Sequence, residues 1–147
     1  MNIISDYQPS DCQGILELWR ATGLGDAHRG DDHKVIMKTL EMGGKLLVLK
    51  SQNDRIIGSS WMTTDGRRLY LHHFGILPEF QGKGLANFLM EESMKFARKT
   101  GLQVKLEVHE SNYKAIALYK KFGFKSLGNY QVYIVREINQ TINKVSE

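Results

Sequence analysis

The chain is poor in cysteine and proline, with one cysteine, Cys12, and two prolines among its 147 residues. A single cysteine excludes an internal disulfide framework and suits a reducing compartment, so we expect a cytoplasmic protein. No window approaches eighteen consecutive apolar residues, and no membrane span is expected. The first residues lack a basic start followed by an apolar stretch, so no signal peptide is predicted.

The composition is that of a globular domain, with 41% hydrophobic and 24% charged residues and a net charge of +4. The length suits one domain with a core of its own. We assign residues 1–138 to this domain and residues 139–147 to a polar tail. No motif that combines aromatic and basic residues accompanies the charge, so neither nucleic acid nor membrane is an expected partner. A local positive patch would suffice for a phosphorylated ligand.

Hydrophobic periodicity and turn residues predict an α/β protein with one mixed, mostly antiparallel sheet of about seven strands and about four helices. The predicted strands are residues 2–7, 45–51, 55–64, 67–77, 102–109, 124–127 and 130–137. Helices are expected after Ser10, after Asp31 or Asp32, over residues 82–99, and from Ser111 or Asn112 to Lys121. The helix between the fourth and fifth strands makes them a parallel crossover pair. Such a pair is a place where a ligand crevice opens.

A glycine-rich segment, Gln81-Gly82-Lys83-Gly84-Leu85-Ala86, stands between a predicted strand and a predicted helix. Its small residues leave backbone N–H groups bare, and a helix N-terminus adds partial positive charge, so the segment suits an anion. Lys83 adds a charge at the rim. A dinucleotide fingerprint fails because Asn87 stands where the third glycine belongs, and the P-loop pattern is absent. The remaining pattern, Gln/Arg-x-x-Gly-x-Gly/Ala, is satisfied, although a tight turn without a ligand fits the same six residues.

Two more blocks follow at residues 106–112 (Leu-Glu-Val-His-Glu-Ser-Asn) and 115–124 (Ala-Ile-Ala-Leu-Tyr-Lys-Lys-Phe-Gly-Phe). Together with residues 74–86, they resemble the core of the GNAT superfamily of N-acetyltransferases in order and spacing. The resemblance covers residues 69–124. It implies a single-domain GNAT fold whose sheet is splayed between strands 4 and 5. It also implies direct transfer of an acetyl group from acetyl-CoA to a primary amine, without a metal.

The resemblance implies where acetyl-CoA binds. Pantetheine would lie between the strand ending at Leu77 and the strand 102–109, the pyrophosphate would rest on the amides of residues 82–87, and Asn112 would bond the pantetheine arm. The implied cofactor-binding residues are Gly75, Ile76, Leu77, Gln81, Gly82, Lys83, Gly84, Leu85, Ala86, Asn87, Asn112 and Tyr119.

The resemblance also implies catalytic residues. Tyr119 resembles the family's general acid, since a phenol with a pKa near 10 stays protonated and can donate to the leaving thiolate. Glu107 resembles the base of members that acetylate protein N-termini. Histone-type members carry a glutamate on the strand before the glycine-rich segment, where Tyr70 stands here. His72 shares the face of Tyr70 and is the alternative base.

Several alternatives stay open. The base is Glu107, His72 or a water, and the acceptor is a small molecule, a peptide or a protein. The chain is a monomer or a homodimer. A second reading is a catalytically silent GNAT module that binds acyl-CoA. The cluster of His28, Asp31, Asp32 and His33 matches no standard zinc spacing, so no metal is expected. Residues 22–32 and 127–133 are expected to shape the acceptor pocket.

Overall fold

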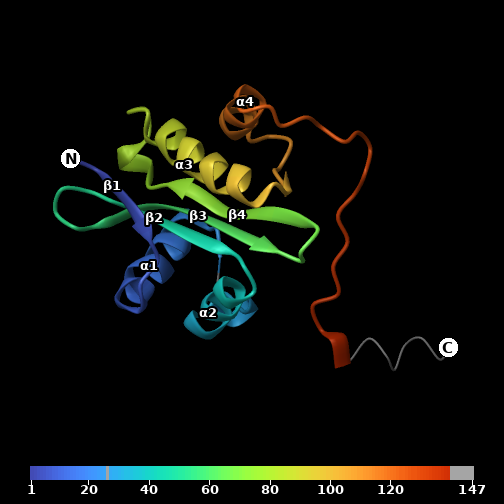
Figure 1. Ribbon diagram of the computed structural model, residues 1–147, viewed down its shortest axis with the longest axis horizontal. Helices are drawn as coiled ribbons and strands as arrows, with labels where there is room; N and C mark the ends of the chain where they lie inside the picture. Colours follow the sequence, from blue (N-terminus) through green and yellow to red (C-terminus); the bar gives the residue numbers. More distant parts are fainter. Residues whose placement is uncertain (26, 140–147) are drawn as a thin grey trace.

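Five strands form a single sheet in the computed structural model, which describes residues 1–25 and 27–139 (Figure 1). The strands lie side by side in chain order. They are β1 (Ile3–Asp6), β2 (Lys45–Lys50), β3 (Ile56–Thr64), β4 (Arg68–Ile76) and β5 (Gln103–Leu106). Neighbours pair antiparallel except β4 and β5, which are parallel. The predicted mixed sheet with one parallel crossover pair is thus confirmed.

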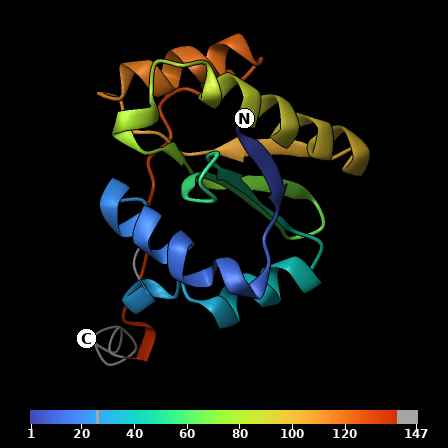
Figure 2. The same cartoon turned by 90° about the vertical axis from the view of Figure 1, so that its left-hand side faces the viewer.

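Four α-helices cover the two faces of this sheet. They are α1 (Cys12–Thr22), α2 (His33–Glu41), α3 (Leu85–Thr100) and α4 (Tyr113–Lys121). The pair α1–α2 lies on one face and the pair α3–α4 on the other (Figures 1 and 2). Short 3-10 turns are η1 (Pro9–Asp11), η2 (Ala27–Arg29) and η3 (Pro78–Phe80). Within the described ranges, no helix is long and apolar enough to cross a membrane.

Helix starts follow the local sequence where a polar side chain can cap them. The Asp32 carboxylate accepts a hydrogen bond from the Val35 N–H at 2.9 Å, and the Asn112 carbonyl oxygen accepts one from the Ala115 N–H at 3.3 Å. Each cap satisfies an N–H group that has no partner within its own helix. The predicted starts of α2 and α4 are therefore confirmed.

Alternation along the strands builds a core on each side of the sheet. On the α1–α2 side, Trp61 of β3 stacks on Trp19 of α1 with 5.2 Å between ring centroids. On the α3 side, the Ser60 hydroxyl lies 2.7 Å from that of Ser93 in α3. Successive residues of a strand point to opposite faces, so β3 serves both layers. Fully buried side chains on the two sides include Ile15, Trp19, Ile36, Leu46, Val48, Met62, Leu69, Leu89 and Met90.

The sheet opens between β4 and β5. Their pairing runs only from Arg68–Gln103 to Leu71–Leu106, whereas β4 continues to Ile76. Beyond Leu71, the edge of β4 that faces β5 has no paired strand among the described residues. This opening, here called the split, confirms the splay that the family resemblance implied. The predicted strand 102–109 is shorter than expected, so Glu107 follows β5 instead of lying within it.

The two predicted C-terminal strands, residues 124–127 and 130–137, are wrong for this structure, and the sheet has five strands instead of about seven. After Phe124 the chain runs away from the sheet (Figure 1). No backbone-to-backbone hydrogen bond of residues 125–135 exists within the described part of the chain. A strand needs a hydrogen-bonded neighbour, and here none is beside it. Most of the predicted polar tail, residues 140–147, lies outside the described residues.

Candidate active site

The glycine-rich segment forms a turn at the end of β4. The Gln81 side-chain amide donates to the Ile76 carbonyl at 2.9 Å and thereby ties the start of the turn to the strand. Gly82 and Gly84 have φ angles of +76° and +80°, which L-residues rarely adopt. A Cβ at either position would meet no heavy atom within 4 Å. These angles delay the start of α3 from the predicted Gly82 to Leu85.

The turn leaves a series of backbone donors open. The first amide of this region to reach a helix carbonyl is Phe88, whose N–H donates to the Gly84 carbonyl at 3.2 Å. None of the hydrogen bonds described has an N–H of residues 82–87 as its donor, and no side chain caps α3. An uncapped helix N-terminus beside glycine is a site for an anion. The segment therefore fits the pyrophosphate of acetyl-CoA.

Basic side chains border this segment. The Lys83 ammonium lies 5.3 Å and the Arg55 guanidinium 5.8 Å from the centroid of the Phe80 ring. From the neighbouring helix, the Lys121 ammonium donates to the Asn87 side-chain oxygen at 2.7 Å. This last bond joins α4 to the first turn of α3, beside the open amides. Lys83 and Lys121 thus bring charge of the sign that favours a phosphate, whereas Arg55 lies 3.6 Å from the Glu79 carboxylate, which offsets its charge.

Of the predicted main-chain contacts on β4, Ile76 is the one directed into the split. The Leu77 N–H donates to the Ile57 carbonyl at 2.8 Å, so it points toward β3. Successive backbone groups of a strand alternate in direction, which turns the Ile76 groups the other way. Gly75 has another role: a Cβ there would lie 2.7 Å from the Leu24 Cδ1 atom. Its lack of a side chain lets the loop after α1 pack on β4.

A β-bulge interrupts β4 beside the split. Trp61 pairs with His72 and Ser59 with Gly75, so one residue of β3 faces two of β4. His73 lies in this bulge with a φ of +46°. The Ser59 hydroxyl donates to the His73 carbonyl at 2.7 Å and accepts from the Trp19 indole at 2.9 Å. Bulges bend a strand and end its regular pairing, which accounts for the opening at this point.

Asp31 reaches this bulge from the loop between α1 and α2. Its carboxylate oxygen lies 3.2 Å from the His73 Nε2 atom, and both side chains are largely buried. The His73 ring also packs edge-on against Trp19, with 4.5 Å between centroids. The sequence predicted that Asp31 caps a helix or lies in a solvated loop. It gave no signal for the pair of Asp31 and His73, because a bulge changes which residues face one another.

The two candidate bases lie on the same face of the sheet. His72 Nε2 is 2.9 Å from the Thr63 hydroxyl, and its ring stacks on Tyr70 at 6.2 Å. Tyr70 pairs with Lys105 on the face that His72 shares, and Glu107 follows just beyond the end of β5, near enough for its carboxylate to act on the His72 imidazole. His72 keeps an exposed face, but the groups packed around its ring partly desolvate it, and this desolvation and then the charge of His73 lower its pKa, while the Glu107 carboxylate opposes this. The imidazole is therefore neutral at pH 7.

Tyr119 approaches from the opposite side of the sheet, on α4. Its ring meets those of Phe74 and Phe124 edge-on, with centroid distances of 6.2 Å and 5.7 Å. Burial raises the pKa of Tyr119, so its phenol stays protonated at neutral pH. The sheet thus separates the candidate acid from the candidate bases, and the split joins the two sides. Asn112, at the start of α4, uses its side-chain oxygen as the helix cap.

Residues 12–124 match the model of the acetyltransferase (GNAT) family. The chain belongs to this family. An acetyltransferase of Pectobacterium atrosepticum is 26% identical to this GNAT chain over 122 residues, which cover 82% of the chain and 86% of that protein. The probable N-acetyltransferase san of Drosophila melanogaster is 33% identical over 99 residues, which cover 63% of the chain and 54% of that protein.

The GNAT chain also resembles solved structures. One is AAC(6')-Iy in complex with the bisubstrate analogue CoA-S-monomethyl-acetylneamine, with a TM-score of 0.72 and 16% identity over 92% of this chain and 99% of that one. At this identity the likeness shows the fold alone. In the parts of the GNAT chain that the structure describes, no group of three or more His, Cys, Asp or Glu side chains could hold a metal ion.

Proposed function

We propose that this GNAT chain transfers an acetyl group from acetyl-CoA to a primary amine of a small molecule or a peptide. The observation that carries the proposal is geometric: Tyr119 of α4 meets Phe74 of β4 on one side of the split, and His72 of β4 lies on the other side. The pKa of Tyr119 is raised and that of His72 is lowered, which fits an acid and a base. The names of relatives, which include a probable N-acetyltransferase, support it.

Acetyl-CoA supplies the activated acyl group and a thiolate leaving group. The open amides of residues 82–87 hold its pyrophosphate, with Lys83 at the rim. The Ile76 N–H points into the split and can bond a pantetheine amide. The Asn112 oxygen already caps α4, so the side-chain NH₂ of Asn112 is the group that can bond another. Binding at several points fixes the thioester relative to the split, and this orientation lowers the barrier to attack.

The acceptor amine must lose a proton before it attacks. His72 is neutral at pH 7 and can take this proton at one ring nitrogen while the other orients the ring. The hydrogen bond with Thr63 supplies that orientation. Glu107, on the same face, is the other candidate base and would also favour the imidazolium that forms. Since His72 shares the face of Trp61, which packs on α1, the acceptor would reach the base from the α1–α2 side.

The leaving thiolate needs a proton or a hydrogen bond. Tyr119 keeps its proton because burial raises the pKa of the phenol. Its contact with Phe74 holds the hydroxyl beside the unpaired edge of β4. The ammonium gives one proton to His72 or Glu107, and the neutral amine then forms a C–N bond with the thioester carbon. As the C–S bond breaks, the phenol protonates sulfur, and the second proton of the attacking nitrogen returns to the phenolate through water. The base releases its proton to solvent, so the products are the amide, the free thiol and one proton.

The function is tested by incubating the chain with acetyl-CoA and parallel panels of small amines and peptides, and following the released thiol. We expect turnover on at least one panel and an acetylated amine by mass spectrometry. If calorimetry detects acetyl-CoA binding and no amine is turned over, the result contradicts the enzymatic proposal. That result would support the silent acyl-CoA-binding module instead.

A further inference from the structure

One face of the β4–β5 pair is open. On the α3 side of the sheet, Leu69 and Leu71 of β4 are only 0% and 6% exposed. On the other side, Tyr70 is half-buried and His72 is exposed. This is the α1–α2 side, because His72 pairs with Trp61, whose ring packs on α1. We call the residues of the β4–β5 pair on this side the open strip: Arg68, Tyr70, His72, Gln103 and Lys105.

The charges of the open strip are ordered along it. The candidate base His72 lies at one end, with the Glu107 carboxylate close to its ring. Lys105 follows, opposite Tyr70, and Arg68 lies at the other end. A strand rises about 3.3 Å per residue, so Lys105 stands about 7 Å and Arg68 about 13 Å along the sheet from His72. Proton acceptors thus lie at one end of the strip and cations at the other.

The two cations have no carboxylate partner within the described part of the chain. Neither Arg68 nor Lys105 takes part in an ion pair there. The nearby Asp65 carboxylate accepts from the backbone N–H groups of Arg67 and Arg68, at 2.8 Å and 3.0 Å. The Arg68 guanidinium donates to the Arg67 carbonyl at 3.4 Å. Two cations without a counter-charge, in a chain of net charge +4, attract an anionic ligand to this end of the strip.

The shape of the open strip favours an extended peptide. Sites for small molecules are concave and enclose most of the ligand, whereas the strip is the surface of two paired strands. An extended peptide rises about 3.3 Å per residue, as the strand beneath it does. With its amine at His72, the peptide therefore places its third residue over the pair of Tyr70 and Lys105. The Tyr70 ring, stacked on His72 at 6.2 Å, gives the peptide an apolar floor.

We propose that the acceptor of this GNAT chain is a peptide N-terminus that carries an acidic side chain at about its third residue. The inference rests on the proposed acetyl transfer and narrows its acceptor. The amine lies at His72, the acidic side chain pairs with Lys105, and Arg68 attracts an acid further along the peptide. Amines with several positive charges are poor acceptors, because the same two cations repel them.

The first test compares two amidated peptides that differ only in glutamate or glutamine as the third residue. Thiol release is followed at a pH where His72 is unprotonated. We expect kcat/KM to be about three- to tenfold higher for the glutamate peptide, the range that one or two partly exposed ion pairs provide. This ratio should fall towards one in about 1 M salt, which screens such pairs. Equal values, a preference for glutamine, or turnover of small amines without turnover of either peptide would overturn the proposal.

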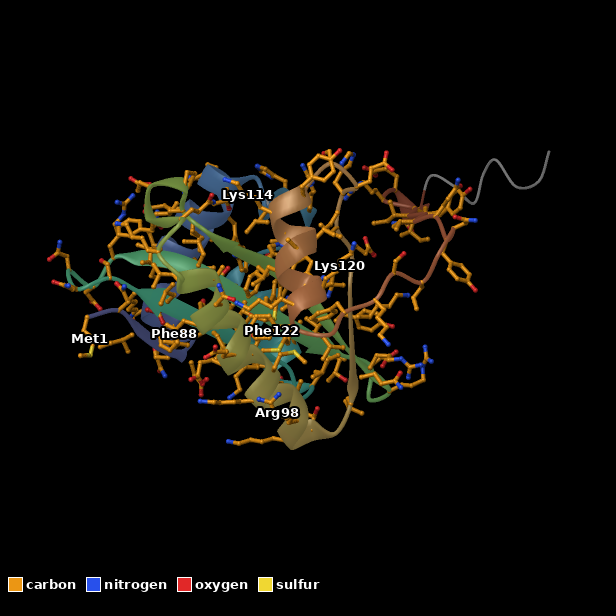
Figure 3. All side chains as sticks on the ribbon, turned by 90° about the horizontal axis from the view of Figure 1, so that it is seen from above. Met1, Phe88, Arg98, Lys114, Lys120 and Phe122 are labelled. Carbon is orange, nitrogen blue, oxygen red and sulfur yellow. The ribbon has the colours of Figure 1, made fainter. Side chains whose placement is uncertain are left out.

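The second test changes the cation and measures the same ratio. Lys105→Glu should bring it to about one or below, and Lys105→Arg should keep it, because only the former reverses the charge. A merely structural loss lowers both rates alike and leaves the ratio unchanged. The control is Arg98→Glu, which makes the same change of charge at an exposed residue of α3, on the other side of the sheet (Figure 3). The proposal is wrong if Lys105→Glu keeps the wild-type ratio or if Arg98→Glu lowers it equally.

The third test needs no chemistry. NMR titration of the CoA-loaded chain should show tighter binding of the glutamate peptide than of the glutamine peptide, and Lys105→Glu should remove the difference. If this difference is found but no amine is turned over, acetyl transfer is refuted and the anion site on the open strip stands. If peptides are turned over but neither binding nor rate depends on the acidic residue, acetyl transfer stands and the inference is refuted.

Discussion

The ring of Tyr119 meets the ring of Phe74 edge to face, with 6.2 Å between the centroids. This contact joins α4 to β4 beyond Leu71–Leu106, the last pair between β4 and β5. The phenol is therefore held at the open part of the split, away from the paired part of the sheet. The same packing buries the phenol in part, and this burial raises the pKa of Tyr119.

Tyr119→Phe keeps the ring contacts and removes only the hydroxyl. We expect kcat to fall by about 10²–10⁴-fold, the usual contribution of a positioned acid. The dissociation constant of acetyl-CoA should change little, because the open amides of residues 82–87 are untouched. Steady-state thiol release and calorimetry measure the two quantities. Tyr113→Phe is the control, since that tyrosine is 78% exposed on the same helix. Full activity of Tyr119→Phe would refute the acid role.

The pH dependence distinguishes the two candidate bases, and we expect His72 to act. Its pKa lies below the ordinary 6.5, so the basic form prevails at neutral pH. The rate constant kcat/KM should be flat above about 6.5 and fall as the pH drops through the lowered pKa. Glu107→Gln removes a charge that raises this pKa, so the falling limb should move to lower pH.

His72→Gln should lower kcat by about 10²-fold or more and abolish this limb. If Glu107→Gln instead abolishes turnover while His72→Gln retains it, the base is Glu107. Retention of turnover in both variants would point to water.

Gly84→Ala tests the glycine-rich turn. Alanine at a φ of +80° is strained by about 1 kcal/mol, and its methyl group would occupy the open space over the helix N-terminus. We expect acetyl-CoA to bind at least about tenfold more weakly. The matched control is Gly101→Ala at the other end of α3, where φ is +73° and the space is also open. It should lower Tm by a similar few degrees and leave acetyl-CoA affinity unchanged. Equal affinities in the two variants would contradict the assignment.

An ion pair between a buried carboxylate and a partly exposed lysine lies at the start of the first helix. The Lys50 ammonium lies 2.8 Å from the carboxylate of Asp11, a side chain that is only 4% exposed. Asp11→Asn should reduce the free energy of unfolding by about 1–3 kcal/mol, because the partner cation stays partly buried. Asp6→Asn breaks the exposed pair with Lys45 and should cost less than about 1 kcal/mol. Urea unfolding of both variants at pH 7 gives the comparison, and equal losses would contradict it.

The same pair predicts an alkaline limit of stability. The hydrogen bond with Asp11, more than any other contact, raises the pKa of Lys50 above its ordinary 10.5. The cation stabilises the fold fully below that ordinary value, and this contribution is lost as the pH rises through the raised pKa. The gap in Tm between wild type and Asp11→Asn should therefore narrow above about pH 10.5. A constant gap up to pH 12 would argue against the charge as its source.

The sequence alone determined the elements whose signals are local. The strands β2 to β4 lie near their predicted bounds because turn residues such as Asp65-Gly66 separate them. The caps at Asp32 and Asn112 use hydrogen bonds within three residues. An anion site at the start of α3 could likewise be anticipated, since glycine before a helix exposes amides wherever it occurs. That the anion belongs to acetyl-CoA was implied by the resemblance of residues 69–124 to the GNAT superfamily.

Only the tertiary structure decided how distant residues meet. The bulge at His73 sets where β4 leaves β5, and this brings His72 and Glu107 to one face while Tyr119 lies on the other. Residues 124–127 and 130–137 have the sequence of strands but form none, because a strand depends on a neighbour for its backbone hydrogen bonds and residues 125–135 have no such bond within the described part of the chain. Hydrophobic alternation predicts which face of a strand will be buried. It does not predict which other segment packs on that face, since that depends on the path of the whole chain.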